Sequence, residues 1–167
     1  MLPKAYRPPE GFCSRPADWT VCDDRSASSR FAAVQAFTRI DDTKIGDRSH
    51  VYEPDFVIVQ DPSLIEFVDV TEGLEADGTL LINSSKDPSE FDLDTEAEIV
   101  TIDATNIALE HLGLPIMNTS LLGAFASISG LMELESIEDV IMSEFPGEIG
   151  EKNVAASSAA YQEVRAV

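Results

Sequence analysis

The stretch that decides the fold is DFVIVQ at residues 55–60, with DPSL directly behind it at 61–64. Four consecutive apolar residues between polar ends are typical of a strand buried on both faces of a parallel sheet. Asp61 can cap a helix that follows, and Pro62 suits its first turn. A strand that leads directly into a helix is the repeating unit of an α/β fold.

The same pattern continues along the chain. TLLIN at 79–83 and EIVTID at 98–103 predict two more buried strands, and a helix is expected from 104 to 112, ending at Gly113. Further helices are expected over 120–131, 136–145 and 148–165, with Ser136 and Asp139 at the spacing of a capping box. This order predicts a three-layer α/β/α arrangement with a mainly parallel central sheet.

The beginning of the chain has a different pattern. The run at 33–40 and the polar turn after it predict a hairpin whose second strand lies near 48–52, which would make the central sheet mixed. Residues 1–30 mix Pro, Arg, Ser and Asp without periodicity, so we expect them to be irregular or disordered, with at most a short irregular element near 19–22. One α/β domain is therefore expected at 31–167.

Composition bounds the class of protein. The chain has 167 residues, of which 44% are apolar, enough for one folded domain with a real core. Its 31 acidic residues against 11 Lys and Arg give a net charge of −20, which disfavours nucleic acid and anionic membrane surfaces as partners. The acidic surface suits either docking to a basic partner or simply a highly solvated protein surface, and we favour the second interpretation.

No apolar run approaches the length of a membrane span, and residues 1–11 lack the apolar core of a signal peptide. A cytoplasmic location is therefore expected. Cys13 and Cys22 are nine positions apart, unlike the CxxC spacing of zinc and redox sites or a four-cysteine cluster pattern. We expect neither a metal nor an iron–sulfur cluster in this chain.

The sequence also lacks the motifs of common catalytic sites. It contains no GxSxG, P-loop or GxGxxG pattern. His50 and His111 are interpreted as ordinary surface or helix-end residues, and the acidic alternation from 92 to 98 as the solvated side of an extended segment. An independent enzyme is thus the least expected of the possible functions.

Two places are candidate ligand or interface positions. Asp61 and Ser63 follow a strand at its carboxyl end, which is the edge where α/β sheets bind ligands. Asn118 and Thr119 precede a helix rich in small residues, LLGAFASISG, that another surface could approach closely. Asn118 or Thr119 could simply cap this helix, or could hydrogen-bond a ligand or partner, and the residue types leave both interpretations open.

Four segments in order, AFTRI (36–40), YEPDFVIVQDPSL (52–64), DVTEGL (69–74) and NTSLLGA (118–124), resemble the gamma subunit or gamma domain of the pyruvate/2-oxoacid:ferredoxin oxidoreductases. The resemblance implies a subunit of an enzyme that converts a 2-oxoacid, coenzyme A and oxidised ferredoxin into acyl-CoA, carbon dioxide and reduced ferredoxin. It also implies that thiamine diphosphate, iron–sulfur clusters and coenzyme A are bound by the thiamine-binding and ferredoxin-like chains of the complex. The isolated chain is then expected to be inactive.

The resemblance fails near the beginning of the chain. Members of the family open with a strand and a Gly-rich loop of the GRGGQG type, and this sequence contains nothing of that kind. The chain could be an incomplete or misread copy, which we favour, a variant that has lost the loop, or one whose missing strand comes from another chain. The alternative function is a free-standing α/β module that binds a small anionic ligand at the strand ends.

Overall fold

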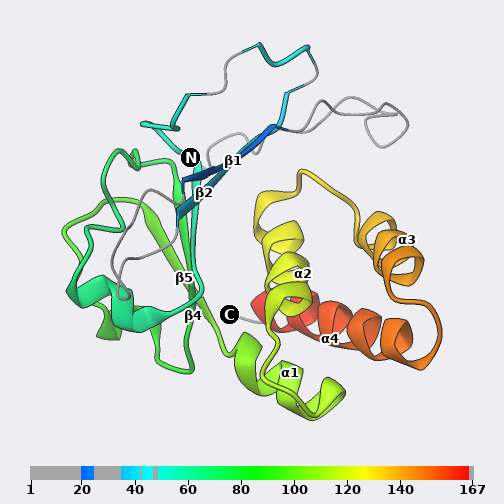
Figure 1. The fold of residues 1–167 in the computed structure, drawn as a ribbon. Coiled ribbons are helices and arrows are strands. Elements are labelled where there is room, and N and C mark those ends of the chain that lie inside the picture. The colour runs from blue at the N-terminus through cyan, green and yellow to red at the C-terminus, as the bar shows by residue number, and fades with distance from the viewer. Residues whose placement is uncertain (1–19, 25–34, 42, 47–48, 166–167) are drawn as a thin grey trace.

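The computed structural model describes residues 20–24, 35–41, 43–46 and 49–165 (Figure 1). Its strands are β1 (Thr20–Asp24), β2 (Gln35–Arg39), β3 (Phe56–Val59), β4 (Thr79–Asn83) and β5 (Glu98–Ile102). Its α-helices are α1 (Ala104–Leu112), α2 (Asn118–Ser129), α3 (Leu134–Glu144) and α4 (Glu148–Arg165), and two short 3-10 helices are η2 (Pro62–Glu66) and η3 (Pro88–Glu90). None of the described helices is both long enough and apolar enough to span a membrane.

The three predicted central strands form a parallel sheet in the order β3-β4-β5, which confirms the predicted α/β class and its parallel sheet. The middle strand β4 is buried at all five positions. β3 differs from the expectation, because Ile58 is 40% exposed. The reason is position, since β3 pairs only with β4 among the described strands and therefore lies at an edge of the sheet.

Each face of the sheet has its own apolar core. Leu81 and Ile102 pack with α1, α2 and α4 on one face. Leu80 and Ile82 point to the opposite face, because successive strand side chains alternate, and there they pack with residues of η2 and the loops, such as Ile65 and Leu93. Figure 1 shows the helices gathered on one side of the sheet. The opposite layer consists mainly of 3-10 helix and loop, and the helix expected after Asp61 is only the short η2.

The predicted hairpin partner is wrong. β2 pairs antiparallel with β1, from Thr20 opposite Arg39 to Asp24 opposite Gln35, and the pair forms a sheet separate from the parallel one. The backbone at residues 49 and 50 binds a side chain of β2 instead. The Arg39 guanidinium donates hydrogen bonds to the carbonyls of Ser49 (3.3 Å) and His50 (2.9 Å).

β1 also gives regular structure to part of the segment that was expected to be irregular. Most of that segment, residues 1–19 and 25–30, lies outside the described residues.

The bounds of α1 and α4 agree with those predicted from the sequence. α1 ends at Gly113, whose φ of 72° lies in the left-handed region that glycine tolerates best. α2 and α3 each begin two residues earlier than expected. The capping box expected from Ser136 is therefore wrong, since that residue lies inside α3 and the N-cap position belongs to Glu133, whose side chain makes no capping hydrogen bond.

Candidate functional site

A buried asparagine joins the carboxyl ends of the parallel strands. Asn83, the last residue of β4, is 6% exposed. Its Nδ2 donates to the Gln60 carbonyl oxygen beyond β3 and to Thr105 Oγ1 in α1, both at 2.9 Å. Its Oδ1 accepts a hydrogen bond from the backbone N–H of Thr105 at 3.3 Å. All the polar atoms of this side chain thus hold two strand ends and a helix start together.

The predicted pair Asp61 and Ser63 lies at the same rim and makes a local cap. Both residues are exposed, and Asp61 Oδ1 accepts a hydrogen bond from the backbone N–H of Ser63 at 3.0 Å. Hydrogen bonds from the side chain and the backbone of Ser63 lower the pKa of Asp61 below its ordinary value of 3.8. Asp103 acts similarly at the next strand end, where its carboxylate accepts from the backbone N–H of Asn106.

The second predicted pair, Asn118 and Thr119, is divided between two environments. Asn118 is exposed in the first turn of α2, whereas Thr119 is half-buried and its Oγ1 donates to Asn153 Oδ1 of α4 at 2.8 Å. The N-cap position belongs to Met117, and no side chain caps the helix there. Of the two interpretations left open for Asn118 or Thr119, capping is therefore wrong, because both residues lie inside α2.

The small residues of α2 allow close approach to a helix of the same chain. A Cβ atom added at Gly123 would lie 2.1 Å from the backbone oxygen of Ser157 in α4, so the two helices pack nearly backbone to backbone at this point. Ala124 of α2 and Ala156 of α4 are fully buried in the same core. The surface expected to approach this helix is thus α4.

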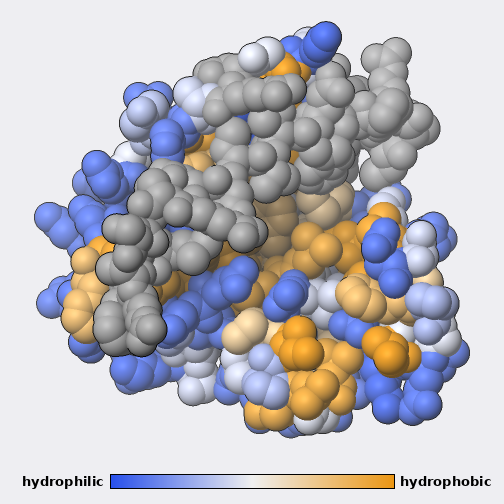
Figure 2. Space-filling view, viewed as in Figure 1, coloured by the Kyte–Doolittle hydropathy of each residue, from blue (hydrophilic) through white to orange (hydrophobic). Residues whose placement is uncertain are grey.

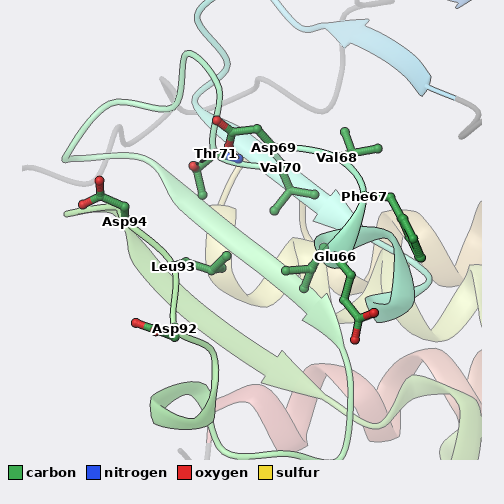
Figure 3. A pocket seen from close by; sticks show the side chains of 10 residues that line it. Glu66, Phe67, Val68, Asp69, Val70, Thr71, Asp92, Leu93 and Asp94 are labelled. Carbon is green, nitrogen blue, oxygen red and sulfur yellow. Dashed lines mark hydrogen bonds between the residues drawn. The ribbon is translucent and has the colours of Figure 1, made fainter.

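An open hollow of about 370 Å³ lies on the opposite side of the sheet, between the segments 65–71 and 92–94 (Figure 3). Leu93 turns toward the sheet and packs in its core, whereas Asp92 and Asp94 turn outward. Asp92, Asp94, Glu96 and Glu98 are all exposed, which confirms that the acidic alternation is a solvated side. The residues that the structure describes contain no group of His, Cys, Asp or Glu placed to hold a metal ion.

The sequence predicted correctly that the strand ends meet at one edge of the sheet, but it did not single out Asn83 there. A lone asparagine at the end of a fully apolar strand is the signal that could have identified it, because a buried amide needs partners. The four predicted positions do not form one constellation through any hydrogen bond found in the described residues: Asp61 bonds to Ser63, and Thr119 bonds to Asn153.

Comparison with known proteins identifies the family to which this chain is similar. Residues 19–163 match the family model described as pyruvate ferredoxin/flavodoxin oxidoreductase. Pyruvate synthase subunit PorC of Methanocaldococcus jannaschii is 52% identical over 135 residues, which cover 81% of this chain and 74% of that protein. The pyruvate/ketoisovalerate oxidoreductases common subunit gamma of Pyrococcus abyssi is 47% identical over 139 residues, with 81% and 75% covered.

Solved structures agree with this assignment. The pyruvate oxidoreductase subunit PORC of Thermotoga maritima superimposes with a TM-score of 0.74 at 32% identity, over 87% of this chain and 79% of that one. The gamma subunit of a keto/oxoacid ferredoxin oxidoreductase from Geobacter sulfurreducens, at 18% identity and a TM-score of 0.69, shares the fold. The sequence matches span most of the described elements, from β1 to α4. The chain belongs to the pyruvate ferredoxin/flavodoxin oxidoreductase family.

Proposed function

We propose that this chain is the gamma subunit of a thiamine-dependent pyruvate or 2-oxoacid:ferredoxin oxidoreductase. The observation that carries the proposal is the 52% identity to a PorC subunit over 135 residues. The proposal rests on this sequence identity, because fold alone would not specify function. The assembled enzyme would oxidise the 2-oxoacid with coenzyme A to acyl-CoA and carbon dioxide, and would pass the electrons to ferredoxin.

The geometry supports a subunit that acts by assembly. The polar side chains of the strand-end rim, Asn83, Asp61 and Asp103, hydrogen-bond the chain's own backbone and helix starts. They therefore stabilise the fold. Thiamine diphosphate, iron–sulfur clusters and coenzyme A would then be held by the thiamine-binding and ferredoxin-like chains with which this subunit assembles.

The test is purification of the tagged full chain from its native host. We expect it to recover other oxidoreductase subunits, together with coenzyme A-dependent reduction of ferredoxin by pyruvate. The same chain produced alone should reduce no ferredoxin. Replacing pyruvate with 2-oxoisovalerate in the assay would show the range of 2-oxoacids. Recovery of the tagged chain without partner subunits and without this activity would refute the proposal.

A further inference from the structure

The feature that the proposed function leaves unused is a stretch almost without charge. Residues 104–132 contain Glu110 as their one acidic residue and contain neither Lys nor Arg, although the whole chain has 31 acidic and 11 basic residues. This stretch forms α1, the linker 113–117 and α2. Folding tends to bury apolar residues of this kind, so a contiguous exposed group of them is informative.

Much of the stretch is instead exposed. Leu114 and Ile116 in the linker are 55% and 50% exposed, and Leu109 in the last turn of α1 is 45% exposed. On α2, exposed Asn118 shares a face with Leu122, four residues later and 37% exposed. We name these five residues the α1–α2 face. Figure 2 shows apolar side chains gathered over α1 and the linker at the lower centre, while the loops of the sheet are mostly hydrophilic.

The α1–α2 face is held in one shape before any partner arrives. Leu112 and Met117, on the two sides of the exposed linker residues, pack into the main core. Within the linker, the backbone N–H of Ile116 donates to the Leu114 carbonyl at 2.8 Å. A partner that binds these side chains would therefore lose little affinity to ordering of the linker.

Apolar exposure without charge is the composition of an interface centre, because charged residues are depleted there. The net charge of −20 favours a basic partner over an acidic one. A second copy would also carry a net charge of −20, so the two whole chains would repel each other as they approached. A chain with an apolar patch bordered by Lys and Arg would gain both apolar burial and electrostatic attraction.

We propose that the α1–α2 face is the surface by which this subunit docks on another subunit of its oxidoreductase, one whose contact surface is apolar at the centre and basic at the rim. The inference deepens the proposed function and rests on it. Asn118, exposed in the first turn of α2, belongs to this surface as an interface residue.

The test compares two double variants of the full tagged chain in the native host. Leu114→Asp with Ile116→Asp places two charges on the α1–α2 face. Val140→Asp with Ile149→Asp is the matched control, because those residues are 59% and 63% exposed on α3 and α4. Circular dichroism and urea unfolding would confirm that both variants fold. We expect recovery of partner subunits to fall about tenfold or more for the first variant and to stay near wild type for the control.

The outcomes separate this inference from the proposed function. If the wild-type chain recovers active oxidoreductase and both variants recover it equally, the docking assignment is wrong and the function stands. Equal loss in both variants also contradicts the assignment. If the wild-type chain recovers no oxidoreductase subunits, the proposed function itself fails.

The salt dependence of binding distinguishes a basic partner subunit from a second copy of this chain. Raising the salt from about 0.1 to 1 M shortens the screening length from about 10 to 3 Å. Binding to a basic rim should weaken over this range, as measured by the dissociation constant of the purified subunits. Self-association of this chain would instead strengthen, because screening reduces the repulsion between like charges. A dimer of the isolated chain that is lost in the Leu114 and Ile116 variant would overturn the choice of partner.

Discussion

Asn83 shows how much a single side chain can hold together in a small parallel sheet. It is the only described residue that bonds, through its side chain, to both the segment after β3 and the start of α1. A main-chain ladder cannot make these connections, because the strands have ended there. The carboxyl edge of the sheet thus depends on a buried amide.

Asn83→Ala should lower the free energy of unfolding by about 1–3 kcal/mol, because the Gln60 carbonyl and the Thr105 N–H lose their partner. Urea unfolding of the purified chain measures this change. Asn106→Ala is the control, because it removes one hydrogen bond between Asn106 and Glu110 on an exposed helix face. An equal loss of stability in both variants would show that the hydrogen bonds of Asn83 contribute no more than one exposed hydrogen bond on a helix.

The cap formed by Asp61, at the same edge of the sheet, should make the stability of the chain depend on pH. The pKa of Asp61 is lower in the folded chain than the ordinary 3.8, through the hydrogen bonds from Ser63. Its contribution to stability is therefore fully present above about pH 4 and is lost as the pH falls through the lowered pKa. Asp61→Asn keeps a capping side chain that does not titrate in this range.

The Asp61→Asn variant should lose less stability than wild type between about pH 4 and pH 2, measured by urea unfolding at fixed ionic strength. Asp92→Asn removes the same charge from an exposed position outside the cap and serves as the control. A wild-type pH profile in the Asp61 variant would contradict the proposed role of this cap.

Among the elements, the crossing of α2 and α4 is the most tightly constrained contact. The two helices approach where Gly123 meets the backbone of Ser157. The hydroxyls of Ser120, Ser127 and Ser157 are buried without a hydrogen-bond partner among the described residues. Small size, rather than polarity, explains their presence, because larger side chains would separate the helices.

Gly123→Ala tests this constraint. Alanine favours a helix over glycine by about 1 kcal/mol, which would stabilise α2. A Cβ atom 2.1 Å from a backbone oxygen must however displace α4, and overpacking of this kind costs about 1–3 kcal/mol or more. We expect the clash to prevail and thermal unfolding to occur at a lower temperature.

The control for Gly123→Ala is Gly46→Ala, because no atom lies within 4 Å of a Cβ built there. It should leave the unfolding temperature nearly unchanged. A Gly123 variant that is more stable than wild type would mean that the two helices can separate without cost.

At the scale of the molecule, the acidic residues are unevenly distributed. The described part of the chain carries acidic residues around the sheet and on α3 and α4, while α1 and α2 are nearly free of them. The net charge of −20 repels itself, which opposes the compact state at low salt.

Raising NaCl from about 0.1 to 1 M should raise the unfolding temperature of the isolated chain, because screening weakens the repulsion among its carboxylates. Calorimetry or circular dichroism measures the shift. A neutral osmolyte at matched osmolality controls for effects that do not depend on charge. A lower unfolding temperature in high salt would show that attractive ion pairs, rather than repulsion, dominate the surface.

The sequence by itself determined the parallel strands, α1, α4 and the family, because each depends on local patterns: apolar runs, Gly113 after a helix, and short segments that resemble the family in the same order. Only the tertiary structure decided the partner of β2, the exposure of Ile58 and the starts of α2 and α3. It also decided the roles of the candidate positions, since Thr119 binds α4 and Asn83 joins two strand ends. These outcomes depend on which distant segment lies alongside, and the residues within one segment do not encode that neighbour.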